Sequence, residues 1–440
     1  MKTFKPFPLP LHVSGVFLFS LIYWIFLSLK SISADLIGYK TLGSIIYHQG
    51  LVGYAATGLQ REPLYPLLCS LAMYVEHLSG VNFTHIMAAL SIIMLMISQI
   101  LIYAILRKLN IRPLICSLVL LYWAVSPCIT ESAFHILLFC EIVTYPLILA
   151  VIIFSYLGWE SVKENDKGEA CAYGALTGLL FALLTLVKAA FECICPAYLI
   201  FFFLGALHKN KFSASLICFL AAAGLLFYSP IVGYKSLNKM YNGHFAVTNR
   251  GDWAFYGVAA HRVRPLKNYL INLDFVIGNC EAFFQSSACN SVSSGISDSL
   301  GTQKAAELAA KHIPPQAVSN TLLQLSIQKI LSHPFQYILL SATEGLKALF
   351  WENNAGIIPL RFIMPIITFF AIIYCCFNFA QAPILIKNIM AMIFLFVFFY
   401  SFFDTLGRYF LPISSLYLIS IGYCMNSLCN FLSPSKNTIV

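Results

Sequence analysis

Residues 178–191 read GLLFALLTLVKAAF, an apolar run that is interrupted at Lys188. The run extends back to about residue 171, so its length approaches the roughly 20 apolar residues that an α-helix needs to cross a bilayer. Runs of similar length recur from residue 12 to residue 429, with short polar breaks between them. This repeated pattern predicts a chain that crosses a membrane many times.

The amino-acid composition supports the same class of protein. Of the 440 residues, 59% are apolar and only 10% are charged, whereas a soluble globular domain carries about 25% charged residues. The alternating strands of a membrane β-barrel are not visible in the sequence. The net charge of +9 is scattered over short loops and forms no basic stripe, which argues against a nucleic-acid partner. We therefore expect an all-α polytopic membrane protein.

The apolar runs predict about ten transmembrane helices. They lie near residues 12–29, 84–106, 113–127, 141–157, 171–188, 190–207, 212–233, 357–377, 386–403 and 409–428. The first run resembles a signal peptide, but it exceeds the usual 7–15 apolar residues of such a signal, so we expect an anchored helix. Residues 63–80 contain two prolines, Glu76 and a terminal Gly80, which favour a re-entrant or interfacial segment.

The basic loops orient these helices, because Lys and Arg are enriched in short cytoplasmic loops. The segments RKLNIR (107–112), WESVKENDK (159–167) and HKNK (208–211) all fall on the cytoplasmic side if residues 63–80 do not span. The outer face then carries segments 30–62, 126–141, 188–192, 234–334 and 404–408. The chain is thus divided into an N-terminal transmembrane module (1–233) with a first outer loop (30–83), an extracytoplasmic segment (234–335) and a C-terminal transmembrane module (336–440).

The extracytoplasmic segment is expected to fold as a small domain, since a structureless loop of about a hundred residues is rare. It has helical patterns at 303–312 and 316–332, and its Cys280 and Cys289 can form one disulfide if they face an oxidising compartment. A polar and aromatic cluster suits stacking on a sugar, with an ordinary folded turn as the alternative. Its members are Asn249, Arg250, Asp252, Trp253 and Tyr256.

Charged residues at the ends of the predicted spans are the candidates for chemistry. Asp35 follows the first span closely, so its carboxylate is expected at the membrane–water boundary, where a base can meet a lipid-linked donor. In TGLQREPLYPLL (57–68), Arg61 can hold a phosphate through paired hydrogen bonds. Lys188 and Arg408 stand at span ends, where membrane anchors also occur, and Glu141 stands at a helix start, where a carboxylate also acts as a cap. Their predicted convergence on one face favours a functional site.

Taken in order, these motifs resemble the GT-C superfamily of integral-membrane glycosyltransferases, in the branch of the protein O-mannosyltransferases and lipid A aminoarabinose transferases. The ordered set is DLIGYKTLGSIIYHQG (35–50), REPLYPLL (61–68), a turn from Ser126 and Pro127 to Glu141, the run 178–188, YNGHF (241–245), NRGDWAFYG (249–257), SHPFQYILL (332–340) and RYFLP (408–412). The chain departs from the family pattern at Leu36, where a second acidic residue is common, and at Ala189, where an Arg-Pro step is common.

The resemblance implies that a sugar moves from a polyprenyl-phosphate donor to an acceptor on the outer face, with inversion at the anomeric carbon. Asp35 is then the general base, and Arg61, Arg408 and Lys188 bind the donor phosphate. The residues expected to shape the site or to orient the acceptor are Tyr39, Glu62, Tyr65, Glu141, Asp252 and Tyr409. No cofactor is required, and a divalent cation, if one binds, is held by Asp35 and Glu141.

The expected location is a bacterial inner membrane, with the site on the periplasmic face and a cell-envelope glycan as the product. The expected partners are membrane lipids, the lipid-linked donor and a glycan, lipid or protein acceptor. A transporter or flippase of lipid-linked sugars is the main alternative, followed by a glycan polymerase or ligase and by a structural membrane protein. Transporters place ionisable residues near the bilayer midplane, often in repeated halves, whereas here they stand at span ends.

Overall fold

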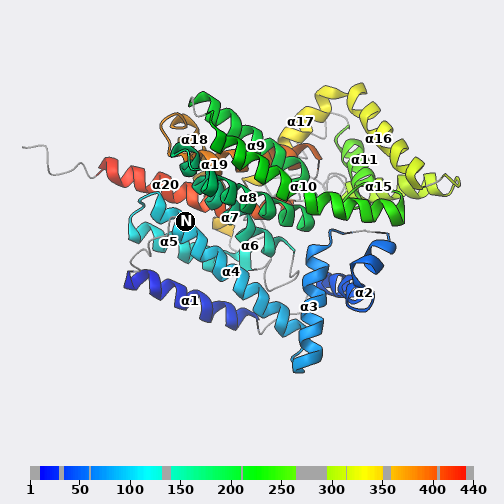
Figure 1. Ribbon diagram of the computed structural model, residues 1–440, viewed down its shortest axis with the longest axis horizontal. Coiled ribbons are helices and arrows are strands. Elements are labelled where there is room, and N and C mark those ends of the chain that lie inside the picture. Colours follow the sequence, from blue (N-terminus) through cyan, green and yellow to red (C-terminus); the bar gives the residue numbers. More distant parts are fainter. Residues whose placement is uncertain are drawn as a thin grey trace, which may run out of the picture.

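The computed structural model describes residues 10–28, 34–58, 61–130, 140–209, 212–263, 295–313, 315–349, 358–403 and 407–432 (Figure 1). Within these ranges the secondary structure is helical and contains no strand, which confirms the all-α class. Eight of the described helices are long and apolar enough to cross a membrane, as expected of a polytopic membrane protein. Cys280 and Cys289 lie outside the described residues.

The first half of the chain contains α1 (Leu11–Ser28), α2 (Ala34–Ala56), α3 (Leu64–Ser79), α4 (Phe83–Lys108), α5 (Pro113–Val125), α6 (Pro127–Thr130), α7 (Glu141–Lys163), α8 (Lys167–Val187), α9 (Phe191–His208) and α10 (Ala214–Asn242). The second half contains α11 (Gly251–Arg262), α15 (Gly295–Ala309), α16 (Pro315–Ser332), α17 (Pro334–Gly345), η2 (Leu346–Ala348), α18 (Ile358–Phe377), α19 (Ile384–Phe403), η3 (Gly407–Ile413) and α20 (Ser414–Leu432).

The eight long apolar helices match eight of the ten expected spans. They are α1, α4, α7, α8, α9, α10, α19 and the stretch Phe410–Leu432 that includes α20. The other two expected spans are shorter apolar helices, Pro113–Val125 and Ile363–Phe377, the latter within α18. The segment expected to be interfacial forms α3, which has only 16 residues and ends at Gly80 in a left-handed conformation.

Small residues allow α8 and α10 to pack closely. A Cβ atom on Gly174 would overlap the backbone of Phe219, and one on Gly178 would overlap the backbone of Ala223. Membrane helices associate through such close contacts, because lipid tails are as apolar as the side chains and provide no hydrophobic driving force. The glycines of α8 therefore determine how near α10 lies.

Buried hydrogen bonds connect the other helices. The Trp24 indole nitrogen of α1 donates to the Ala124 carbonyl oxygen of α5 at 2.9 Å, and Gln99 of α4 donates to Ser20 of α1 at 2.8 Å. Between α7 and α9, the hydroxyl groups of Ser155 and Tyr198 are 2.8 Å apart. Each bond satisfies polar groups that have no water to bind inside a bilayer, so these contacts specify which helices are neighbours.

Different segments of the chain lie at the two ends of the bundle. At one end, the Lys108 ammonium of α4 lies 5.5 Å from the Tyr156 ring centroid of α7, and Ser215 of α10 donates to Asn165 in the α7–α8 turn. The basic loops predicted to be cytoplasmic therefore lie together. At the other end are the helices α2, α11, α15 and α16, on the right in Figure 1. The expected helical pattern at 316–332 corresponds to α16, and the pattern at 303–312 overlaps the second half of α15, which begins at Gly295 and ends at Ala309.

We expect Gly178→Ala to destabilise the protein by about 1–3 kcal/mol, the typical cost of overpacking, because the new methyl group meets the α10 backbone. Gly224→Ala is the matched control, since a Cβ there has open space and alanine is the better helix former. Thermal unfolding of the purified variants in detergent measures both. Equal stability of the two variants would contradict the close α8–α10 contact.

Candidate functional site

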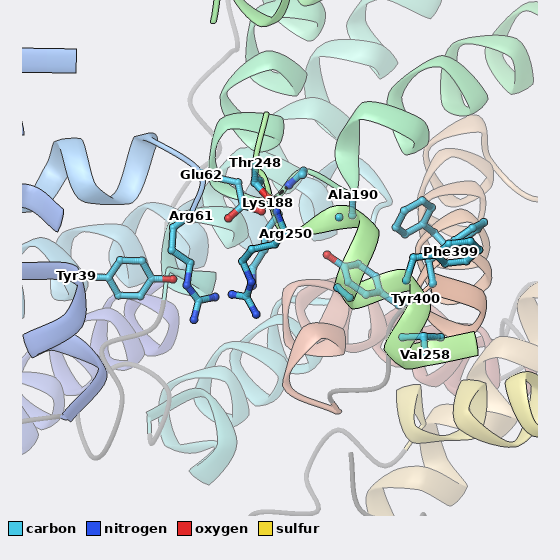
Figure 2. Close-up of a pocket in the computed structure, with 15 residues that line it drawn as sticks. Tyr39, Arg61, Glu62, Lys188, Ala190, Thr248, Arg250, Val258, Phe399 and Tyr400 are labelled. Atoms are coloured by element: carbon cyan, nitrogen blue, oxygen red, sulfur yellow. Dashed lines mark hydrogen bonds between the residues drawn. The ribbon is translucent and has the colours of Figure 1, made fainter. Parts of the chain in front are cut away.

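A cavity of about 250 Å³ lies where the α2–α3 connection, the α8–α9 turn, the start of α11 and the end of α19 meet (Figure 2). These segments are far apart in the chain, and three of them belong to the predicted outer face. The cavity is lined by Tyr39, Arg61, Glu62, Lys188, Ala189, Ala190, Thr248, Arg250, Gly251, Ala254, Phe255, Val258, Phe399, Tyr400 and Phe403.

One side of this cavity is cationic. Arg61, Lys188 and Arg250 line it, and Glu62 is the one carboxylate among the described lining residues. Figure 2 shows the guanidinium groups of Arg61 and Arg250 pointing to the same side of the cavity. Arginine suits bidentate recognition of phosphate, so an anion is the favoured ligand for this side.

A hydrogen bond connects the α2–α3 connection to the α8–α9 turn. The Glu62 carboxylate accepts from the backbone N–H of Ala189 at 3.0 Å, and the Tyr54 hydroxyl donates to the Arg61 carbonyl oxygen at 2.9 Å. Together these contacts hold the backbone of residues 61 and 62 against the end of α8. Arg61 and Lys188 thereby line the same cavity.

A buried ion pair lies behind the cavity wall. The Lys188 ammonium is 2.7 Å from the Glu141 carboxylate, and the Glu141 side chain is only 1% exposed. Glu141 is the first residue of α7, and Lys188 directly follows the last residue of α8. Both residues occupy the helix ends expected from the sequence, and the structure shows that they are partners.

Tyr39 of α2 links the cavity to this pair. Its hydroxyl donates to the Cys140 sulfur at 3.4 Å, and the Cys140 thiol donates to Glu141 at 3.5 Å. Burial raises the pKa of Tyr39, and Cys140 adds a smaller increase. Burial also raises the pKa of the Cys140 thiol, and the nearby Glu141 charge raises it further. Both groups are protonated at neutral pH and act here as hydrogen-bond donors. The Arg61 guanidinium lies 5.9 Å from the Tyr39 ring centroid.

The opposite side of the cavity is apolar and aromatic. Phe255 and Val258 of α11 face Phe399, Tyr400 and Phe403 at the end of α19, and the labelled residues Val258, Phe399 and Tyr400 lie away from the arginines in Figure 2. The cavity is therefore amphipathic. It fits a ligand with an anionic group at one end and an apolar group at the other.

Three expected site residues have side chains outside the described part of the structure. Asp35 lies in the first turn of α2, four residues before Tyr39, which is about one helical turn. Arg408 and Tyr409 belong to η3, which begins four positions after the cavity residue Phe403. The roles of these residues therefore stay predictions.

Three further expected residues lie outside the cavity lining. Tyr65 is buried behind Tyr39, with the two ring centroids 4.7 Å apart, and Glu141 is covered by Lys188. Asp252 lines a neighbouring cavity of about 710 Å³ together with Trp253 and accepts a hydrogen bond from Ser319 of α16.

Arg250 is the cavity residue whose place the sequence does not predict. The sequence predicts Arg250 as part of a polar and aromatic cluster that stacks on a sugar, and the structure places it in the cationic wall of the cavity. The only sequence signal is a cation immediately before a short helix, and this pattern is common at loop ends. Its guanidinium also lies 4.9 Å from the ring centroid of Trp253, which lines the neighbouring cavity.

Among the described residues, no group of three or more His, Cys, Asp or Glu side chains lies close enough together to hold a divalent cation. The Glu141 carboxylate, one of the two expected ligands, already forms an ion pair with Lys188. The side chain of the other, Asp35, is not described. Metal binding by this pair stays a prediction.

Comparison with known proteins gives no match: no family model matches the chain, and no curated protein is significantly similar to it in sequence.

We expect Lys188→Met to destabilise the protein by about 3–5 kcal/mol, because it leaves the Glu141 charge buried without its partner. The double variant Glu141→Leu with Lys188→Met is expected to recover most of this loss, since no charge remains to be desolvated. Chemical unfolding in mixed micelles measures both.

Lys163→Met is the control for this pair, because its partner Glu160 is partly exposed and such surface pairs contribute less than about 1 kcal/mol. The single variant Glu141→Leu completes the comparison. If the double variant loses as much unfolding free energy as Glu141→Leu and Lys188→Met together, the two side chains do not act as a buried pair.

Proposed function

We propose that this protein is a membrane glycosyltransferase that moves a sugar from a polyprenyl-phosphate donor to an acceptor on the outer face of the membrane. The observation that carries the proposal is the amphipathic cavity, which combines three cations with an aromatic wall at the end of the bundle opposite to the basic loops. A polyprenyl-phosphate sugar has the same two parts, an anionic phosphodiester and an apolar tail.

In this proposal the donor phosphate lies between Arg61, Lys188 and Arg250. The lipid tail extends past the aromatic residues at the end of α19. Preorganised cations stabilise the charge that develops on the leaving phosphate, and such electrostatic stabilisation is usually the largest contribution to catalysis. Arg408 is proposed to join this group from η3, as the resemblance to the GT-C superfamily implies.

Asp35 is the proposed general base. It removes a proton from the acceptor hydroxyl or amine while that atom attacks the anomeric carbon, and the phosphate leaves from the opposite side with inversion. Its position one helical turn before Tyr39, which lines the cavity, supports this role. Tyr39 near the start of α2 and Arg61 after its end line the same cavity, which supports a position of the proposed base close to the cationic wall.

The proposed topology has about ten spans, with α5 and α18 crossing in addition to the eight long helices. The helices α11, α15 and α16 pack around Tyr256, Leu308 and Leu322 and form a small extracytoplasmic domain. The proposed location is a bacterial inner membrane with the cavity on the periplasmic side. Support comes from the basic loops, because all of them lie at the other end of the bundle, where the positive-inside rule places the cytoplasm.

A transporter of lipid-linked sugars is a weaker reading of the same structure. Transporters bind their substrate near the bilayer midplane, often at broken helices, whereas the cations and the ion pair described here lie at helix ends. A glycan polymerase or ligase uses a diphosphate donor, and nothing in the single cationic wall favours two phosphates over one.

Asp35→Asn is expected to lower the transfer rate by roughly 10²–10⁴-fold, the usual contribution of a positioned general base. Donor binding is expected to change little, because the cations are intact. Transfer from a purified polyprenyl-phosphate sugar by the protein in detergent measures the rate. Glu164→Gln, an exposed carboxylate at the other end of the bundle, is the control. Near wild-type turnover in a well-folded Asp35→Asn variant would show that another residue is the base.

Arg250→Ala is expected to raise the donor KM about 10–100-fold, the range for losing a hydrogen bond to a charged group, while the acceptor KM stays unchanged. Steady-state kinetics with each substrate varied in turn provides the comparison. Arg112→Ala is the matched control, because Arg112 is exposed near the end of α20 and bonds to Asn430. Equal increases in both KM values would argue against a phosphate-binding role.

A further inference from the structure

A second cavity, of about 530 Å³, lies at the end of the bundle that carries the basic loops. It is formed by the last turns of α7, the second half of α9, the α18–α19 connection and the first turns of α19. The lining residues are Trp159, Lys163, Phe201, Phe202, Gly205, His208, Lys209, Phe379, Ala380, Gln381, Ala382, Ile384, Lys387 and Asn388.

The two cavities lie on opposite surfaces of the bundle. The 18-residue α9 begins beside Ala190, which lines the first cavity, and ends at the second cavity. The 20-residue α19 begins at the second cavity and ends at Phe403 in the first. Helices of these lengths span about 27–30 Å, close to the roughly 30 Å thickness of the bilayer core. The two cavities therefore lie at opposite ends of helices that are long enough to cross a bilayer core.

The second cavity carries positive charge that the described side chains do not balance. Lys163 pairs with Glu160 at 2.9 Å. In the part of the chain that the structure describes, no carboxylate pairs with Lys209 or Lys387. Lys387 also lies in the first turn of α19, where the helix dipole is positive and a cation is unfavourable. A bound anion would offset both effects.

The walls of the cavity suit a lipid. Trp159, Phe202 and Phe379 provide aromatic surface, and aromatic residues are enriched at the level of the lipid headgroups. The Lys387 ammonium donates to the Ala380 carbonyl oxygen at 2.9 Å and lies 5.5 Å from the Phe379 ring centroid, so the charged group stays beside the aromatic wall. Asn388, which is only 1% exposed, adds a buried amide and donates to Ser155 at 3.4 Å. The cavity thus combines a cationic rim with an apolar interior.

We propose that this second cavity binds the phosphate headgroup of an anionic phospholipid from the leaflet opposite to the first cavity. The phosphate lies between Lys209 and Lys387, and the acyl chains follow the apolar surfaces of α9 and α19. Basic pockets between transmembrane helices commonly bind anionic headgroups. The proposal does not depend on the transfer reaction, because the two cavities share no residue.

Native mass spectrometry of the full-length protein in detergent tests the proposal. Phosphatidylglycerol and phosphatidylcholine with the same acyl chains are titrated separately, and phosphatidylglycerol is expected to bind more tightly. Each basic residue near an anionic headgroup contributes about fivefold in affinity, so Lys209→Gln and Lys387→Gln are each expected to weaken phosphatidylglycerol binding about fivefold. The double variant is expected to lose about 25-fold. Lys167→Gln, an exposed lysine on the same side that does not line the cavity, is expected to bind like the unmodified protein.

Several outcomes would overturn the proposal. Equal affinity for the two lipids in the unmodified protein would exclude a site for an anionic headgroup, and this measurement needs no variant to fold. Equal weakening by Lys167→Gln would indicate only a general surface charge effect. Displacement of phosphatidylglycerol by millimolar inorganic phosphate would assign the cavity to a free anion. Retained phosphatidylglycerol selectivity in the Lys209 and Lys387 variants would place the lipid elsewhere.

Discussion

The Lys188–Glu141 ion pair is the contact on which the arrangement of the first cavity depends. A buried charge is tolerated only with a partner, so the contact between the end of α8 and the start of α7 is needed to bury Glu141. The next residue, Ala189, then offers its backbone N–H to Glu62. The ion pair thereby determines where the α2–α3 connection docks and brings Arg61 to the cavity.

The middle of the bundle is organised by different forces. Glycines of α8 permit backbone contact with α10, and a few buried hydrogen bonds, such as that between Trp24 and Ala124, select neighbouring helices. These contacts carry no net charge and suit an environment without water. Charged groups gather at the helix ends, where they reach the interface. The bundle therefore has a packed, structural centre and two ends at which charged side chains line cavities.

The two surfaces use different cations. The first cavity presents Arg61 and Arg250 together with Lys188, and planar guanidinium groups orient a phosphate through paired hydrogen bonds. The second cavity presents lysines, which act as flexible point charges and do not impose an orientation. This difference fits the two proposals. A reacting phosphodiester must be held in one geometry, whereas a lipid headgroup needs only charge compensation.

The sequence by itself determined the class of fold and most helix positions, including α15 and α16, because bilayer thickness and helix periodicity act on consecutive residues. It also placed Glu141 and Lys188 at helix ends, since a charge interrupts an apolar run. Only the tertiary structure decided that these two side chains pair, that Arg250 enters the cavity and that Asp252 lies in the neighbouring one. Those outcomes depend on which helix ends meet in space, and local sequence patterns carry no information about such distant contacts.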